Sequence, residues 1–68
     1  MKNLTEREVE VLNLLAEGHS NDEIASSLSV TKSTIKKHLE SIFNKLGVYN
    51  RVQASVKYVL MRNNIYKL

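Results

Sequence analysis

Apolar residues recur along the chain at spacings of three and four, which brings side chains to one face of an α-helix. The clearest stripe lies in the middle of the chain and consists of Ile35, Leu39, Ile42, Phe43 and Leu46. Shorter stripes of the same kind lie on either side of it. Together they predict four helices, at about residues 5–17, 21–28, 32–46 and 51–63. The fold class that follows is all-α, a four-helix bundle-like domain.

Residues that favour helix ends fall at the predicted boundaries. The predicted N-caps are Thr5, Ser20, Thr31 and Asn50. Thr5 and Ser20 are each followed three residues later by a glutamate, which is the spacing of a capping box. Gly18 and Gly47 are the only glycines, and each follows a predicted helix, where a left-handed residue ends the helix at little cost.

Length and composition narrow the functional classes. The 68 residues fit a single domain, residues 1–68. The chain has no Cys and only two His, so a metal site is not expected, and we expect no cofactor. No apolar run approaches the about 18 residues that span a bilayer, so we expect no membrane partner. No Ser–His–acid spacing or glycine-rich phosphate loop occurs, so the protein is not expected to be an enzyme.

Charge divides the chain into two halves of opposite sign. Residues 1–30 carry two basic and six acidic side chains, whereas residues 31–68 carry eight basic side chains and one acidic side chain. The net charges are therefore −4 and +7, which give the total of +3. A basic half predicts an anionic partner on one side of the domain, although a solvated basic face explains the same asymmetry.

A short capped helix, a link of about three residues and a longer helix form a helix-turn-helix pattern. The side of helix 32–46 opposite its apolar stripe is polar and basic, with Ser33, Lys36, Lys37, Glu40, Ser41 and Asn44. Lys36 and Lys37 can donate to guanine in the major groove, and Glu40 can accept from cytosine N4. The alternative is that Glu40 forms only intrahelical ion pairs with the two lysines, which lie three and four residues before it.

Residues beside this polar arc are expected to meet phosphates, which position a protein without reading sequence. The predicted backbone contacts are Asn21, Thr31, Ser33, Thr34, His38, Lys45 and Arg51. For Asn21 the alternative is capping of helix 21–28, and for Arg51 it is an internal pair with an acidic residue of helix 5–17. Tyr49 and Tyr58 are predicted to lie in the core or at its rim.

Helix 51–63 has two apolar faces, whereas a terminal helix of a small domain needs only one. Val52, Val56, Val59 and Leu60 lie on one side, and Ala54, Tyr58, Met61 and Ile65 lie roughly opposite. One face is therefore predicted to pack on the core and the other on a second copy of the chain. The alternative is a helix covered on both sides by its own domain and tail.

Four segments of the chain carry a family resemblance, in order and at the right spacing. They are LTEREVEVL at residues 4–12, SNDEIA at 20–25, TIKKH at 34–38 followed by Ile42, and KLGVYNR at 45–51 followed by Ala54. These segments resemble the LuxR-type (FixJ/NarL-type) DNA-binding domain of bacterial transcription regulators. The resemblance covers about residues 4–60.

The resemblance implies a four-helix domain that binds double-stranded DNA as a dimer and regulates transcription. It implies base contacts from Lys36, Lys37 and Glu40 and backbone contacts from Thr34 and His38. The last helix would form the homodimer interface, with Val52, Val56 and Val59. RNA polymerase is the expected further partner, and the cytoplasm is the expected location.

Such domains usually follow a sensor domain, so we expect an output domain excised from a response regulator, with a free-standing regulator as the alternative. A promoter-recognising sigma-factor region has a similar opening and helix pair, but generally lacks the segment from Gly47 through Arg51 and the helix after it. A protein-interaction bundle that binds through Val52, Val56 and Val59 would leave the basic arc without a purpose.

Overall fold

Four helices make up the computed structural model, which describes residues 3–63 and contains no strand in that part of the chain. They are α1 (Glu6–Ala16), α2 (Asn21–Leu28), α3 (Lys32–Leu46) and α4 (Arg51–Arg62). The predicted all-α architecture is therefore confirmed, and each boundary agrees with the predicted one to within a residue. Ile65, assigned to the second apolar face of the last helix, lies outside the described residues.

The helix starts follow from local hydrogen bonds. In each case the side chain of the N-cap accepts from the backbone N–H three residues later, and the caps are Thr5, Ser20, Thr31 and Asn50. Both predicted capping boxes form, because Glu8 and Glu23 also accept from the backbone N–H of their N-caps at 2.9 and 2.8 Å. These bonds satisfy N–H groups that a helix start otherwise leaves without partners.

The turns between helices use left-handed backbone. Gly47 caps α3 at φ +68°, and the N–H of Val48 donates to the carbonyl of Phe43 to close the end of the helix. The turn between α2 and α3 passes through Ser29 at φ +58°, a conformation that costs a residue with a Cβ about 1 kcal/mol or more. Val30 then packs on the core, and the chain continues into α3.

One hydrophobic core lies among the four helices. Its largest fully buried side chains are Val11, Leu12, Ile24, Ile35, Ile42 and Leu46. Phe43, which the pattern placed in the stripe of α3, is only partly buried. The core holds α3 by its apolar side, so most of the polar side of this helix stays at the surface.

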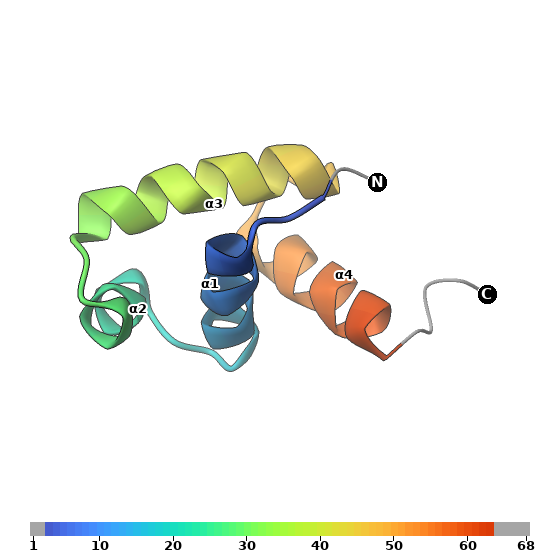
Figure 1. The fold of residues 1–68 in the computed structure, drawn as a ribbon. Coiled ribbons are helices and arrows are strands. Elements are labelled where there is room, and N and C mark those ends of the chain that lie inside the picture. The colour runs from blue at the N-terminus through green and yellow to red at the C-terminus, as the bar shows by residue number, and fades with distance from the viewer. Residues whose placement is uncertain (1–2, 64–68) are drawn as a thin grey trace.

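Figure 1 shows α3 running along one side of the molecule, with α1 and α4 beneath it and α2 under its N-terminal end. α1 packs against each of the other three helices. Ala54 and Tyr58 bring α4 to the core, and the Tyr58 hydroxyl donates to Asn13 Oδ1 of α1 at 2.7 Å. Of the two apolar faces of the last helix, the one with Ala54 and Tyr58 is therefore the face that packs on the core.

Candidate nucleic-acid interface

The polar arc of α3 is exposed where the sequence predicts it. Lys36, Lys37 and Glu40 are all exposed, as are Ser33 and Asn44. Among residues 3–63, Glu40 forms no ion pair with either lysine, so the intrahelical pairing offered as an alternative does not occur. Its carboxylate and both ammonium groups are available to an outside partner. Their assignment to base edges stays a prediction.

A buried carboxylate that the sequence analysis did not assign ties α3 to α1. Glu8 is only 4% exposed, and its side chain accepts from Ser41 Oγ and Lys45 Nζ of α3, both at 2.7 Å. It also accepts from the backbone N–H of Thr5. Burial alone would raise the pKa of Glu8, but the hydrogen bonds from Lys45, Ser41 and Thr5 and the charge of Lys45 outweigh it and lower the pKa to about 2.

Glu8 therefore changes how two residues of α3 are understood. Ser41 belongs to the predicted polar arc, yet it is partly buried and its hydroxyl donates to Glu8. Lys45, for which a phosphate contact is predicted, forms an ion pair with Glu8. Its phosphate contact stays a prediction. A sequence signal existed, because Glu8 lies on the same face of α1 as Val11, Leu12 and Leu15. A charged residue on a core face needs a partner.

The other predicted backbone contacts lie at the N-terminal part of α3. Thr31 and Ser33 are exposed, and Thr34 and His38 are partly exposed. The hydroxyls of Thr31 and Thr34 lie 2.9 Å apart, within hydrogen-bonding distance. These residues are accessible to a bound polyanion, and their phosphate contacts stay predictions.

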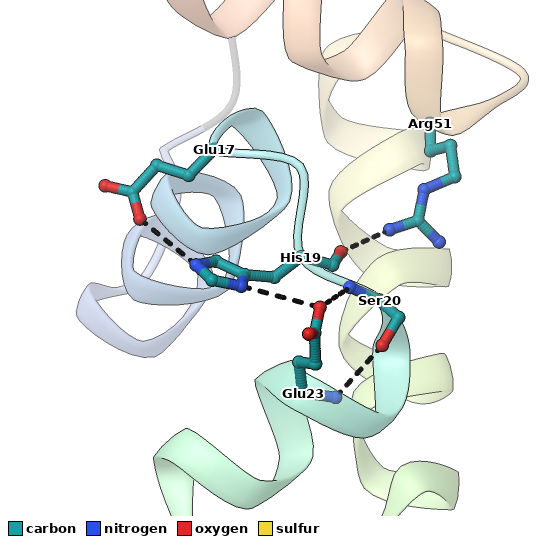
Figure 2. A network of polar contacts seen from close by, with 5 residues as sticks. All are labelled: Glu17, His19, Ser20, Glu23 and Arg51. Atoms are coloured by element: carbon teal, nitrogen blue, oxygen red, sulfur yellow. Dashed lines mark hydrogen bonds and ion pairs between the residues drawn. The ribbon is translucent and has the colours of Figure 1, made fainter.

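Arg51 connects the start of α4 to the turn before α2. One nitrogen of its guanidinium donates to Asn21 Oδ1 at 3.1 Å. Another donates to the carbonyl of His19 at 2.8 Å, as Figure 2 shows. An ion pair between Arg51 and an acidic residue of the first helix was one of two predictions, and it does not form within residues 3–63. Capping by Asn21 was also wrong, because Ser20 caps α2 and Asn21 is its first residue.

His19 lies between two carboxylates in the turn that Arg51 contacts. Its Nε2 is 3.5 Å from Glu17 Oε1 and its Nδ1 is 3.5 Å from Glu23 Oε1, as Figure 2 shows. The backbone N–H of Ser20, which donates to Glu23, is the largest influence that holds the pKa of Glu23 below its usual range. The turn is thus fixed by side-chain contacts from both of its ends.

A surface cavity of about 380 Å³ opens between α3 and the starts of α2 and α4. The lining residues are Asn21, Lys36, Leu39, Glu40, Phe43, Asn50 and Arg51. They include two of the predicted base contacts and two of the predicted backbone contacts. Residues from separate parts of the sequence are therefore gathered around one hollow beside the polar arc.

The outer face of α4 carries two exposed valines. Val52 and Val56 are 68% and 54% exposed, whereas Val59 and Leu60 are partly buried. Val56 and Leu60 border two hollows of about 480 and 260 Å³, so they form a ridge between them. Within residues 3–63, no segment of the chain covers this ridge, and the tail that the alternative invokes lies outside the described residues.

Tyr49 differs from its prediction. It lies in the turn between α3 and α4 and is 90% exposed, so it belongs neither to the core nor to its rim. Its ring borders the larger of the two hollows along α4. Tyr58, by contrast, is in the core as predicted.

Residues 3–63 contain no group of three or more His, Asp or Glu side chains that could hold a metal ion. Among the described helices, none has both the length and the hydropathy needed to cross a membrane.

Comparison with known proteins gives one consistent result. The sequence profile of the family described as bacterial regulatory proteins, luxR family, matches residues 2–58. The response regulator protein VraR of Staphylococcus aureus is 48% identical over 62 residues, which are 91% of this chain and 29% of VraR. The VraR protein of Staphylococcus epidermidis matches to the same extent. This chain therefore spans less than a third of the length of these relatives.

Solved structures show the same similarity. The DNA-binding domain of the response regulator ComA, in its complex with the anti-activator RapF, matches with a TM-score of 0.78 and 42% identity. The match covers 79% of this chain and 93% of the ComA domain. The response regulator ChrA of a heme-sensing two-component system matches with a TM-score of 0.85 and 39% identity over 91% of this chain and 31% of ChrA.

Proposed function

Because this chain belongs to the luxR family of bacterial regulatory proteins, we propose that it binds DNA through α3. Proteins of this family are DNA-binding transcription regulators and not enzymes. α3 enters the major groove of duplex DNA with its polar arc toward the bases. The observation that carries this proposal is the division of α3 into a buried apolar side and an exposed side with Lys36, Lys37 and Glu40. A helix held in this way fits the width of the groove.

Each part of the arc has a chemical role in this proposal. Lys36 and Lys37 donate to guanine O6 and N7, and Glu40 accepts from cytosine N4. Thr34 and His38 meet phosphates on the flank of α3 that faces α1. The net charge of +7 on residues 31–68 adds a sequence-independent attraction to the backbone.

Two copies of the chain pair through α4 in this proposal. Val52, Val56 and Leu60 are spaced by four residues, so they form one ridge along the helix. A ridge with a hollow on each side is suited to packing against its own copy across a two-fold axis, with helices crossing at about −50°. The two α3 helices then meet half-sites about one helical turn, roughly 10 bp, apart.

The whole protein in which this domain acts is proposed from its relatives. VraR, ComA and ChrA are response regulators, and the ComA match is to its DNA-binding domain. We therefore propose that this chain is the output domain of a response regulator. It would act on the nucleoid in the cytoplasm, with RNA polymerase as the partner through which transcription changes.

Selection of bound duplexes from a random pool tests the proposal. We expect a two-fold symmetric sequence with half-sites about 10 bp apart, and an affinity that falls steeply with salt because bound phosphates release counterions. Recovery of random sequences with no common half-site would contradict sequence-specific binding. A single half-site without symmetry would contradict the pairing through α4.

A further inference from the structure

The cavity between α2, α3 and α4 contains two predicted backbone contacts that touch each other. Asn21 and Arg51 are 30 residues apart in sequence, yet a guanidinium nitrogen of Arg51 donates to Asn21 Oδ1 at 3.1 Å. Both residues line the cavity. They therefore form one hydrogen-bonded pair at the wall of the cavity.

The bond between them fixes the direction of the Asn21 amide. Arginine has only donors, so the oxygen of the amide must face the guanidinium and its NH₂ group must point elsewhere. That NH₂ group has no partner among residues 3–63. Arg51 uses one N–H on Asn21 and one on His19, which leaves three of its five N–H groups for another acceptor.

The surroundings of this pair favour an anion of limited size. Lys36 lines the same cavity and, within the described residues, has no hydrogen-bond or ion-pair partner. Glu40 lines it as well, one helical turn or about 6 Å further along α3. Its carboxylate repels an anion, so the favourable part of the cavity is the part near Lys36. Leu39 and Phe43 give the cavity an apolar floor.

We infer that Asn21 and Arg51 together hold a single phosphodiester of duplex DNA, with the adjoining deoxyribose against Leu39 and Phe43. This inference rests on the proposed DNA binding and assigns one phosphate per half-site to one pair of side chains. Arg51 has two roles in it, because it orients the Asn21 amide and donates to the phosphate itself. The start of α4, capped by Asn50 at the cavity wall, adds its positive end.

The decisive variant is Asn21→Asp. An aspartate keeps an oxygen for Arg51 and suits the first turn of α2, so the domain is expected to fold as stably as the parent. It replaces the NH₂ donor with a negative charge, so the affinity for a selected duplex is expected to fall about 10- to 100-fold. Thermal unfolding of the variant checks that the fold is kept.

Neutral methylphosphonate linkages, placed one at a time along each strand of the selected duplex, locate the phosphate. We expect one position per half-site at which the neutral linkage lowers the affinity of the parent protein. At that position it should not further lower the affinity of the Asn21→Asp or Arg51→Ala variant. Arg7→Ala is the control for Arg51→Ala, because it also removes one positive charge, but from α1, where Arg7 pairs with Glu10. Each neutral linkage should change the affinity of this variant as it changes that of the parent.

A double-mutant cycle tests whether the two residues act as one unit. The double variant with Asn21→Ala and Arg51→Ala should bind the duplex only slightly more weakly than either single variant. In the double variant with Arg51→Ala and His38→Ala, the two losses of affinity should multiply. Equal sensitivity of all variants at every linkage, or independent effects of Asn21 and Arg51, would overturn the inference. Proposed DNA binding would survive that result, because it fails only when no duplex is selected at all.

Discussion

Glu8 makes the stability of this domain depend on pH in a way that can be calculated. The folded domain holds the pKa of Glu8 at about 2, against 4.5 for an unperturbed glutamate. Because the folded state binds this proton less tightly than the unfolded state, the contribution is complete above pH 4.5 and is lost as the pH falls toward 2. A difference of about two and a half pKa units corresponds to about 3 kcal/mol. The total free energy of unfolding of a domain of 68 residues is about 3 to 10 kcal/mol, so Glu8 supplies a large share of it.

The perturbation that isolates this contribution is Glu8→Gln. At neutral pH the free energy of unfolding of the variant is expected to be about 3 kcal/mol lower than that of the parent, because Lys45 loses its charged partner. The gap in stability between the two proteins should shrink steadily as the pH falls from 4.5 toward the pKa of the parent carboxylate. Urea unfolding followed by far-ultraviolet circular dichroism, at a series of pH values between neutral and about 2.5, measures the gap.

Two controls keep this measurement interpretable. Glu10→Gln removes a carboxylate of the same helix that is 57% exposed and 3.5 Å from Arg7, and it should cost less than about 1 kcal/mol at any pH. Glu8→Gln combined with Lys45→Met removes both partners and should recover stability if the single variant is largely unfolded. A gap between parent and Glu8→Gln that stays constant as the pH falls would refute the reasoning.

Three further predictions concern binding, pairing and the turn before α3. Lys37→Ala should weaken binding to the selected duplex by about 1–3 kcal/mol and relax preference at one base pair, whereas Arg7→Ala should leave the preference unchanged; repeated selection measures both. Val56→Asp should abolish pairing in sedimentation, because it places two charges at an apolar contact, whereas Ser27→Asp on α2 should not. Ser29→Gly should raise the melting temperature, with about 0.5–1 kcal/mol gained, because glycine adopts φ +58° without strain; an unchanged melting temperature would contradict this.

The helices were predictable because their determinants are local. Each start depends on a side chain and a backbone N–H three residues apart, so Thr5, Ser20, Thr31 and Asn50 mark the boundaries within the sequence itself. The exposed arc of α3 follows in the same way, since a regular apolar stripe fixes which side is left for solvent. The exposed positions of Lys36 and Lys37 were therefore foreseeable.

Contacts between distant segments were not predictable from such patterns. Glu8 finds Ser41 and Lys45 across 33 and 37 residues, and no local rule joins an acidic residue of one helix to a particular pair on another. The internal partners of Arg51 were expected to be acidic, and they are an amide and a backbone carbonyl. The exposure of Tyr49 depends on how the turn after α3 leaves the core, which composition does not encode.

The two polar sides of α3 have different consequences for how this protein can change over evolutionary time. Ser41 and Lys45 are committed to Glu8, so replacing them costs folding free energy. Lys36, Lys37 and Glu40 have no partner in the described part of the molecule, so replacing them leaves the scaffold intact. Under the proposed base contacts, target preference can therefore drift through these three positions while the fold is conserved, so single substitutions would retune one architecture to new operators.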